Sequence, residues 1–489
     1  MVKAATKAEA IFTRAPAAHV IDKTTDDGIF EKPGRAKPGH ELLRVSTGRA
    51  VVIVPVLQRS HANDGVRDSP GAAVVTHSPD DRLTEATGLA EAIDLEIADA
   101  RVVGITTPRP STLFGKGKVE ELRLLVEETG AGLVIVDHAI TPVQQSNLEK
   151  AWNAKVLDRT GLILEIFGRR ARTREGRLQV ELAHLTYQKG RLVRAWTHLE
   201  RQRGGGGFLG GPGEAQLELD RRILETRIES IKRELAQVVK TRELHRAGRR
   251  KVPYPIVAIV GYTNAGKSTL FNLVTGAAVL AKDQVFATLD PTMREVKLRS
   301  GRRIILSDTV GFISSLPTML VAAFRATLEE VIEADLILHV RDISHPETDA
   351  QAADVEGVLS DLGVDTVPAH SHILEVWNKI DLLSPVTREE ATNMSRFQER
   401  RPALVSAITG DGIPELLDAI DTRLGASDAV LDVTLPAHDG RLLAWVHENT
   451  DVLTRTTDEV TGALRLTLRT TPENKARLEA QLRKSTDNR

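Results

Sequence analysis

A phosphate-binding loop constrains this chain more than any other segment. Residues 261–268 read G-Y-T-N-A-G-K-S and directly follow the apolar run 256–260. A strand, a loop bounded by glycines and a helix start are what a phosphate cradle requires. Backbone N–H groups can point at phosphate oxygens, Lys267 adds a positive charge at the β- and γ-phosphates, and the Ser268 hydroxyl can bind Mg²⁺. The helix expected from Ser268 through Thr275 would turn its positive end toward the anion. The loop indicates a nucleoside triphosphate without indicating which base.

Composition limits the remaining options. The 489 residues are enough for about three domains, and the hydrophobic content of 41% allows sizeable cores. With a net charge of −2, any contact with nucleic acid must come from a local patch. The absence of cysteine excludes a disulfide framework, thiol catalysis and cysteine metal sites, and fits the cytosol. No apolar run approaches the roughly 18 residues that span a membrane.

The first part of the chain predicts a small α/β domain over residues 46–168. Residues 1–45 lack the apolar core of a signal peptide and are expected to be a disordered extension, and the polar stretch 58–82 is expected to be a flexible insert. Strands and helices alternate, which is typical of a parallel sheet. The expected strands are 50–57, 100–105, 132–136 and 155–157, and the expected helices are 118–129 and 142–151.

Residues 169–251 predict a basic helical hairpin. Apolar residues recur at alternating steps of four and three, which gives one apolar seam on each of two helices. The seam positions are 178, 182, 185, 192, 196 and 199, with Lys189 in the one gap, and then 224, 228, 231, 235 and 238. The glycine-rich segment 204–213 lies between the two, so the helices should fold back antiparallel around it as a tip.

Charge favours RNA as the partner of this hairpin. Residues 169–203 hold ten Lys or Arg residues against three acidic ones. A phosphate backbone would explain this excess, and a solvated helix face is the alternative. The tip has its own alternative, a plain flexible linker, but a linker does not need an embedded phenylalanine. The expected RNA contacts are Gly204, Gly205, Gly206, Gly207, Phe208, Arg201 and Arg203.

A second motif, N-K-I-D at 378–381, indicates guanine. It follows the strand-like run 373–377. The Asp381 carboxylate can accept from both N1–H and the exocyclic amine of guanine, whereas adenine would leave it unpaired. Asn378 would brace the loop and Lys379 would pack over the base. A last loop at Ser406, Ala407 and Ile408 would contact the guanine oxygen through its backbone.

Two segments between these motifs predict the magnesium and γ-phosphate contacts. D-T-V-G at 308–311 follows a strand, so Asp308 can hold the magnesium shell while the Gly311 N–H meets the γ-phosphate. The segment 286–292 should supply a threonine to Mg²⁺, with Thr288 favoured over Thr292. The nucleotide-binding set is therefore Gly261, Tyr262, Thr263, Asn264, Ala265, Gly266, Lys267, Ser268, Thr269, Phe286, Ala287, Thr288, Leu289, Asp290, Asp308, Thr309, Val310, Gly311, Asn378, Lys379, Ile380, Asp381, Ser406, Ala407 and Ile408. Lys267, Thr288 and Gly311 are the expected catalytic residues, and Ser268 and Thr288 the expected ligands of Mg²⁺.

Phe312 bears on the mechanism. Ras-like GTPases place a glutamine at this position to orient the attacking water, and a phenyl ring cannot do so. We therefore expect slow hydrolysis by the isolated protein, with the catalytic geometry completed by a partner.

From about residue 50 to the end, the chain resembles the HflX family of translational GTPases, within the larger Obg-like group. Short family-specific segments carry this resemblance together with the phosphate loop. They are 114–118 (FGKGK), 137–138 (DH), 158–164 (DRTGLIL), 179–183 (QVELA), 196–202 (WTHLERQ), 211–214 (GPGE) and 286–290 (FATLD). The chain departs from the family pattern in the extension, in the insert, at Ala215 and at Ile408.

The resemblance implies an α/β architecture with several domains. After the N-terminal domain and hairpin it implies a G domain over 252–425, built on a mixed six-stranded sheet flanked by helices, and a small α+β domain over 430–489. In the latter we expect strands at 431–435 and 464–468 and a helix at 472–484. The implied ligands are GTP or GDP and Mg²⁺, with Thr288 rather than Thr292 as the magnesium ligand.

The implied activity is the GTP-dependent splitting or rescue of stalled ribosomes, with hydrolysis stimulated by the ribosome. The implied partners are the large ribosomal subunit and its rRNA, and no DNA is expected to bind. The protein would be a monomer that lies in the cytoplasm and associates with the ribosome. Two other hypotheses stay open: a nucleotide switch that docks on RNA or on a non-ribosomal protein, and a P-loop ATPase or RNA helper whose N-terminal domain binds adenine nucleotides.

Overall fold

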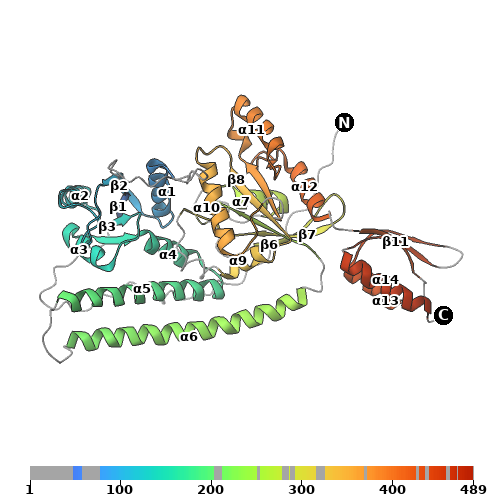
Figure 1. Ribbon diagram of the computed structural model, residues 1–489, viewed down its shortest axis with the longest axis horizontal. Coiled ribbons are helices and arrows are strands. Elements are labelled where there is room, and N and C mark those ends of the chain that lie inside the picture. The colour runs from blue at the N-terminus through green and yellow to red at the C-terminus, as the bar shows by residue number, and fades with distance from the viewer. Residues whose placement is uncertain are drawn as a thin grey trace, which may run out of the picture. The chain divides into compact units, whose positions relative to one another are not determined.

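The computed structural model (Figure 1) describes most of the chain from residue 48 onward. The described residues are 48–57, 77–202, 212–249, 254–277, 286, 292–314, 325–367, 372–425, 429–435, 440–458, 463–470 and 472–487. The expected disordered extension and residues 58–76 of the expected insert lie outside them.

A four-stranded parallel sheet forms the first part of the described chain, as the sequence predicts. Its order is β2-β1-β3-β4, and β1 pairs with β2 and β3 while β3 pairs with β4, all in parallel. The strands are β1 (Arg49–Leu57), β2 (Glu96–Ile105), β3 (Leu133–Val136) and β4 (Lys155–Asp158). In β1, alternate residues face opposite cores, because side chains of a strand point to alternating sides.

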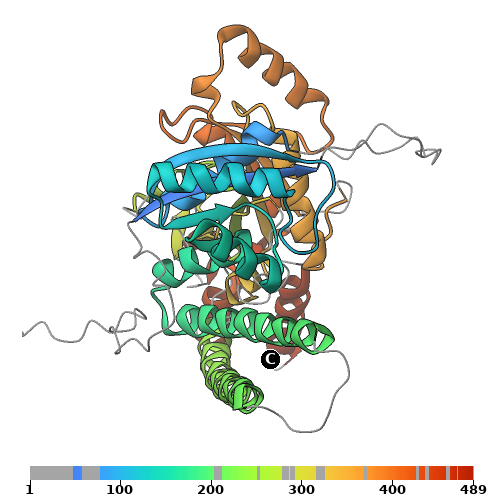
Figure 2. The same ribbon diagram turned by 90° about the vertical axis from the view of Figure 1, so that its left-hand side faces the viewer.

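Helices cover both faces of this sheet (Figure 2). They are α1 (Pro79–Glu91), α2 (Lys116–Thr129), α3 (Pro142–Trp152) and α4 (Arg159–Arg170). Residues of α2 and α3 share a core with Val51 and Ile53, and residues of α1 and α4 share the other core with Val52 and Val54. The sheet is therefore buried on both sides, as parallel sheets are.

The predicted end of the flexible insert at residue 82 is wrong, because residues 79–82 form the first turn of α1. Ser78 is the N-cap, and its hydroxyl accepts a hydrogen bond from Asp81 N at 3.1 Å. Pro79 at the first helical position and the acidic residues Asp80 and Asp81 favour a helix start here. The polar character of this stretch thus comes from a helix cap.

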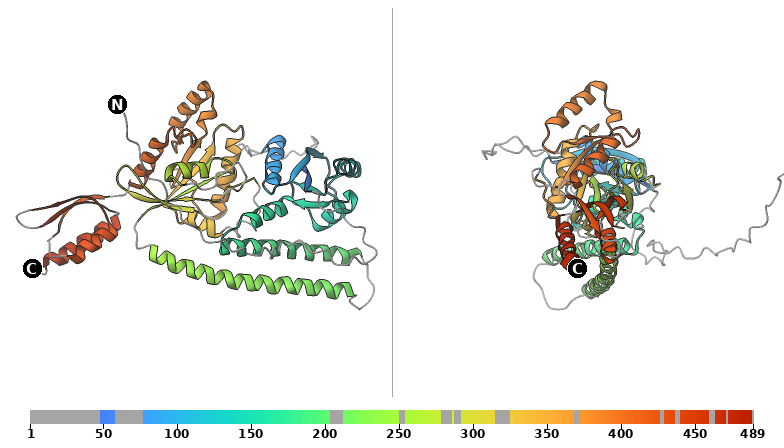
Figure 3. Two further views of the ribbon diagram at one scale, coloured as in Figure 1. Left: turned by 180° about the vertical axis from the view of Figure 1, so that it is seen from behind. Right: turned by 90° about the vertical axis from the view of Figure 1, so that its right-hand side faces the viewer.

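The predicted antiparallel hairpin is confirmed. It consists of α5 (Arg174–Gln202) and α6 (Pro212–Arg249), which lie side by side in Figure 3. Three ion pairs join the helices in antiparallel order: Arg174 with Glu234 at 3.8 Å, Glu181 with Arg227 at 2.7 Å, and Lys189 with Glu225 at 3.0 Å. Lys189, which interrupts the apolar seam, is thus bound to the opposite helix.

A mixed six-stranded sheet forms the next part of the chain, and this prediction is also confirmed. Its order is β10-β9-β8-β5-β7-β6, and only β6 runs antiparallel to its neighbour. The strands are β5 (Ile256–Gly261), β6 (Thr292–Lys297), β7 (Arg303–Asp308), β8 (Leu336–Asp342), β9 (Ile373–Asn378) and β10 (Ala403–Leu404). The helices are α7 (Lys267–Thr275), α9 (Arg325–Ile332), α10 (Thr348–Asp361), η1 (Ile380–Leu382), α11 (Pro385–Phe397) and α12 (Ile413–Gly425).

The last part is a three-stranded antiparallel sheet with two helices. The order is β11-β13-β12, from β11 (Ala429–Leu435), β12 (Asp451–Thr457) and β13 (Leu464–Thr470). The helices are α13 (Gly440–Asn449) and α14 (Pro472–Asp487), and of these elements the sequence did not predict β12 and α13.

One apolar core joins the first sheet to the second. It contains Phe167 of α4 together with Phe286 and Phe312, and the rings of Phe167 and Phe286 meet edge to face at 4.7 Å. The division of the chain into domains at 168, 251 and 425 stays a prediction, and α4 ends at Arg170, just past the first of these boundaries. Among the helices formed by the described residues, none is long and apolar enough to cross a membrane.

Candidate functional site

The phosphate loop lies where parallel strand β5 ends, and its glycines are required by geometry. Gly261 has φ +152°, and a Cβ there would lie 2.2 Å from Val340 O of the neighbouring strand. Gly266 has φ +91°, and a Cβ there would lie 2.2 Å from Asn378 Nδ2. Both positions exclude a side chain because the crowding atoms are backbone or a buried amide. The loop is thus held between β8 and the base motif.

Lys267, the first residue of α7, is buried with only 6% of its surface exposed. Its Nζ donates to Tyr262 O at 2.6 Å, so the side chain curls back over the loop. Burial lowers the pKa of Lys267 to about 8, although the Asp308 carboxylate acts against this shift. A buried cation without a full counter-charge is what a phosphate group would stabilise.

Ser268 and Asp308 supply oxygens that fit Mg²⁺. The Ser268 hydroxyl donates to Asp308 Oδ2 at 2.7 Å, which brings the helix start and the end of β7 together. Asp308 is fully buried. Oxygen ligands of this kind are those that Mg²⁺ prefers in nucleotide sites. Thr288, the other expected ligand, lies outside the described residues, as do Ala287, Leu289 and Asp290.

Gly311 lies against the same loop. A Cβ on Gly311 would lie 2.8 Å from Thr263 Cγ2 and 2.9 Å from Lys267 Nζ. The segment before it is fixed by the Thr309 hydroxyl, which donates to Ile259 O at 2.5 Å. Gly311 and Lys267 therefore converge on one point beside the loop.

Phe312 does not face this point. Its backbone pairs with the phosphate loop: Thr263 N donates to Phe312 O at 2.7 Å, and Phe312 N donates to Gly261 O at 3.1 Å. The ring is 1% exposed and belongs to the core that also contains Phe167. A side chain here is packed away from solvent, so this position offers nothing that could orient a water.

Asn378, at the end of β9, links the phosphate loop to the base loops. Its Nδ2 donates to Ala265 O at 2.8 Å, and its Oδ1 accepts from Ala407 N at 2.9 Å. Asn378 is 1% exposed. The sequence-based role of Asn378 as a brace agrees with this geometry.

The other residues expected to bind guanine lie close to Asn378 or to Ala407 in the chain. Lys379 has φ +65°, and its Nζ lies 2.7 Å from Asp342 Oδ2. Asp381 lies in η1 with its side chain exposed, and Ser406 is buried. Ile408 is 75% exposed. Asp342 was missed by the sequence analysis, although a carboxylate at the end of buried strand β8 was a usable signal.

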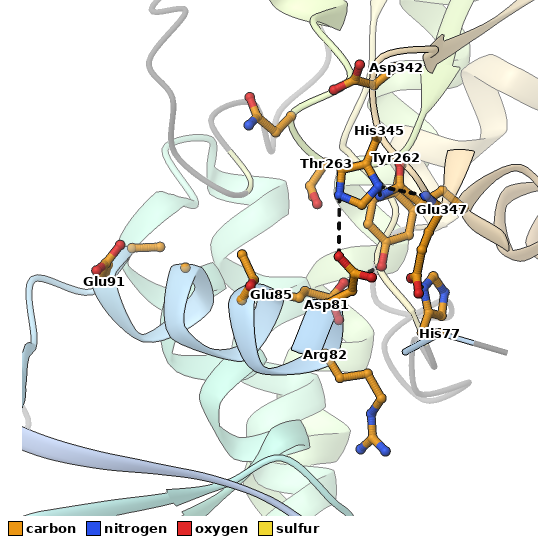
Figure 4. Close-up of a pocket in the computed structure, with 15 residues that line it drawn as sticks. His77, Asp81, Arg82, Glu85, Glu91, Tyr262, Thr263, Asp342, His345 and Glu347 are labelled. Carbon is orange, nitrogen blue, oxygen red and sulfur yellow. Dashed lines mark hydrogen bonds and ion pairs between the residues drawn. The ribbon is translucent and has the colours of Figure 1, made fainter. Parts of the chain in front are cut away.

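A cavity of about 380 Å³ lies beside the phosphate loop (Figure 4). Thr263 and Asn264 line it from the loop, and α1 and the segment before α10 line it from the other sides. His77 binds Glu347 Oε2 at 2.6 Å and Asp354 Oδ2 at 2.8 Å. The hydrogen bond to Asp354 raises the pKa of His77 to about 9, against the effect of burial and with further help from Glu347.

A buried polar cluster also joins α1 and α4 to the phosphate loop. It consists of Glu85 of α1, Arg159 of α4, Tyr262 of the loop, Ser314 and Asp137. Arg159 donates to Glu85 Oε2 at 2.7 Å and to Ser314 O at 2.8 Å, and it also binds Asp137. Burial would lower the pKa of Arg159, but the carboxylates of Glu85 and Asp137 raise it above its ordinary value.

Asp158, the neighbour of Arg159, binds the hairpin instead. Its carboxylate accepts from the Tyr187 hydroxyl and, at 3.0 Å, from Arg191 Nη1, both on α5. It also caps α4 through Gly161 N at 2.8 Å. Burial raises the pKa of Tyr187, and the Asp158 charge adds to this effect. Asp158 thus binds α5, whereas the next residue, Arg159, binds Glu85 and Ser314.

Several basic residues of the hairpin region are used inside the fold. Arg169 binds Ile93 O at 2.6 Å, and Arg191, Lys189 and Arg174 bind the carboxylates given above. The raw charge count therefore overstates the free positive charge of this region. The expected tip residues Gly204, Gly205, Gly206, Gly207, Phe208 and Arg203 lie outside the described residues, and the side chain of Arg201 is not described.

The fold and the site define a P-loop nucleotide-binding protein in which a G domain follows an α/β part and a helical hairpin. Four family models match: "GTP-binding GTPase N-terminal" over residues 80–168, "GTP-binding GTPase Middle Region" over 170–249, "50S ribosome-binding GTPase" over 256–379 and "HflX C-terminal domain" over 394–489. The chain belongs to the HflX family of GTPases and is a GTP-binding protein.

Curated relatives agree with this assignment. "GTPase HflX" of Magnetococcus marinus is 52% identical over 372 residues, which cover 76% of this chain and 84% of the relative. "GTPase HflX" of Escherichia coli is 46% identical over 362 residues, which cover 74% and 83%. The structure of a GTP-binding protein from Sulfolobus solfataricus in complex with GDP overlaps 77% of this chain and 98% of its own, at 21% identity and a TM-score of 0.39.

Proposed function

We propose that this protein binds the large ribosomal subunit in its GTP-bound state, splits or rescues stalled ribosomes, and hydrolyses GTP when the ribosome stimulates it. The observation that carries the proposal is the long antiparallel hairpin of α5 and α6, which Tyr187 and Arg191 in the middle of α5 anchor to Asp158 at the end of β4. The description "50S ribosome-binding GTPase" of the family model that matches the G domain supports the same partner. We further propose a cytoplasmic, ribosome-associated location.

The residues of the site have distinct roles in this proposal. Lys267 and the backbone of the loop hold the β- and γ-phosphates, and Asp381, Lys379 and the 406–408 backbone hold guanine. Ser268 would hold Mg²⁺ together with Thr288, with Asp308 behind them; the ion would neutralise charge that develops on the phosphates. Each of these roles is supported by the position of its residue where the structure describes it.

Hydrolysis needs a water-orienting group that the chain does not present at position 312. The Phe312 ring is packed in the core, so no rearrangement of this side chain alone would bring a polar group to the γ-phosphate. We therefore propose that the ribosome completes the catalytic geometry. A high turnover rate of the purified protein without ribosomes would contradict this.

Sucrose-gradient sedimentation tests the ribosome proposal. The full chain is mixed with ribosomes and a non-hydrolysable GTP analogue, and we expect it to move with large subunits while intact ribosomes decrease. GDP in place of the analogue is the nucleotide control. If the protein stays at the top of the gradient with both nucleotides, the proposal is wrong and a switch acting on another partner takes its place.

Variants of the hairpin tip separate RNA contact from nucleotide binding. Replacing the glycines at 204–207 with alanine, or Arg201 and Arg203 with glutamine, should reduce splitting and leave GTP affinity intact. Arg123→Gln on α2 removes a surface charge outside the hairpin and is the matched control. Loss of GTP binding in the tip variants, or equal splitting by all of them, would show that the tip is not the RNA contact.

A further inference from the structure

The hydroxyl of Tyr262 leaves the phosphate loop and enters the polar cluster of α1 and α4. Tyr262 Oη donates to Glu85 Oε1 and accepts from Ser314 N at 2.7 Å. The side chain is only 7% exposed, and its ring lies in the core shared by the two sheets. Figure 4 shows Tyr262 and Glu85 on the facing elements. Burial raises the pKa of Tyr262, and the Glu85 charge adds to this effect, so the hydroxyl remains a donor.

Ser314 is held by the same cluster through every polar atom it has. Its N also lies 3.3 Å from Glu85 Oε1, its Oγ donates to Glu85 Oε2 at 2.6 Å, and its O accepts from Arg159 at 2.8 Å. Ser314 follows Gly311 by three residues, and Phe312 between them pairs with the phosphate loop. Both ends of the short segment 311–314 are therefore fixed.

The charged groups of the cluster are paired, because Arg159 binds both Glu85 and Asp137. Burial alone would raise the pKa of Glu85, but Arg159 and the hydrogen bonds from Ser314 and Tyr262 hold it below its ordinary value. Glu85 is thus a carboxylate whose two oxygens both accept hydrogen bonds. Hydrogen bonds to a buried charged group are stronger than neutral ones, and removing one leaves a costly unpaired group.

We propose that Glu85 and Arg159 are positioning residues for the γ-phosphate: through Tyr262 and Ser314 they hold segment 311–314 so that the Gly311 N–H stays beside Lys267. This inference rests on the proposed role of Gly311 in binding the γ-phosphate. It assigns to the N-terminal part of the chain a share in distinguishing GTP from GDP. GDP has no γ-phosphate, so its affinity depends on the loop, Lys267 and the base motif, which Asn378 holds independently.

Tyr262→Phe tests the proposal with the least disturbance. It removes one hydroxyl and leaves the ring in the core and the pair of Glu85 with Arg159 intact. We expect the affinity for a non-hydrolysable GTP analogue to fall on the order of tenfold, while the affinity for GDP changes less than about twofold. Tyr254→Phe is the control, because it removes a tyrosine hydroxyl outside the cluster, on a ring that lies against the Arg303 guanidinium.

Glu85→Gln provides a second variant and a test of direct coupling. It keeps the shape of the side chain, so its fold can be checked by thermal unfolding before binding is measured. In the double variant with Tyr262→Phe, the loss of GTP over GDP preference should be smaller than the product of the two single losses, because both changes break one contact.

Two results would overturn the proposal. If affinities for GTP and GDP fall by the same factor, the cluster only supports the loop. If the GTP affinity rises, the cluster holds Gly311 away from the phosphate. The measurement needs no ribosome, so a failure of the ribosome proposal in the gradient leaves this result interpretable.

Discussion

Nucleotide binding should weaken as the pH rises, because Lys267 loses its proton in the empty protein. Its pKa is lowered to about 8 by burial, so in the free protein the ammonium is mostly charged at neutral pH and mostly neutral above about pH 9. A bound triphosphate favours the charged form. With this pKa, the charged fraction falls about fourfold between about pH 7 and 8.5, and the affinity should fall by the same factor, about 0.8 kcal/mol.

Titration calorimetry in two buffers of different ionisation enthalpy measures this effect directly. At about pH 8 the phosphates are fully ionised and Lys267 is half charged, so binding should take up about half a proton per nucleotide. Lys267→Arg keeps a cation that does not titrate in this range, so its affinity should be independent of pH whatever its absolute value. Staying below pH 9 keeps the N1 proton on guanine.

Two outcomes would refute this reasoning. One is an affinity of the wild type that does not change between these pH values, and the other is the release of protons on binding. The same pKa shift has the opposite effect on the empty protein. A lysine whose folded pKa is lowered from 10.5 to about 8 opposes folding below pH 8, and that cost disappears as the pH rises toward 10.5. Unfolding by urea without nucleotide should therefore show stability increasing in this window.

Three further predictions use other parts of the site. Asp381→Asn should lower the affinity for GTP at least about a hundredfold and improve that for xanthosine triphosphate, as competition binding would show; unchanged guanine affinity would disprove the base assignment. Asn378→Ala leaves Ala265 O and Ala407 N unpaired, so urea unfolding should show a loss of about 2–4 kcal/mol; a loss below about 0.5 kcal/mol would mean that the brace is dispensable. The ion pairs of His77, whose pKa is raised to about 9, stabilise fully below pH 6.5 and are lost as the pH rises through about 9; His77→Gln should therefore cost about 1–2 kcal/mol at pH 6 and little above pH 10, and an equal cost at both would count against the ion pairs.

The sequence predicted those parts of the fold that depend on local patterns. These patterns are visible within short stretches of chain. They are the strands and helices expected up to residue 157, the apolar seams of α5 and α6, and the strand before the phosphate loop. The sequence analysis predicts neither α1 nor α4. The start of α1 falls in the polar stretch 58–82, although a serine before a proline and two acidic residues is typical of a helix start. Helix α13 and strand β12 are not predicted either.

The contacts between distant segments could not be predicted from one sequence. Glu85 and Ser314 are separated by 229 residues, and Tyr262 and Glu85 by 177. In the sequence, Glu85 looks like any acidic residue of an amphipathic helix, since nothing local shows that its face is buried against a phosphate loop. Arg159 was singled out only because the D-R-T-G segment carries the family resemblance, and its partners became known only from the structure.

The adjacency of Asp158 and Arg159 has an energetic consequence for the whole chain. One side chain binds α5 and the next binds Ser314, so a small shift at the start of α4 alters both contacts together. Coupling between two binding sites is reciprocal by thermodynamic necessity. If GTP in place of GDP raises the affinity of the hairpin for its partner by some factor, then binding of that partner raises the preference of the site for GTP over GDP by the same factor. A ribosome that engages the hairpin would thereby favour the GTP-bound state of the protein that acts on it.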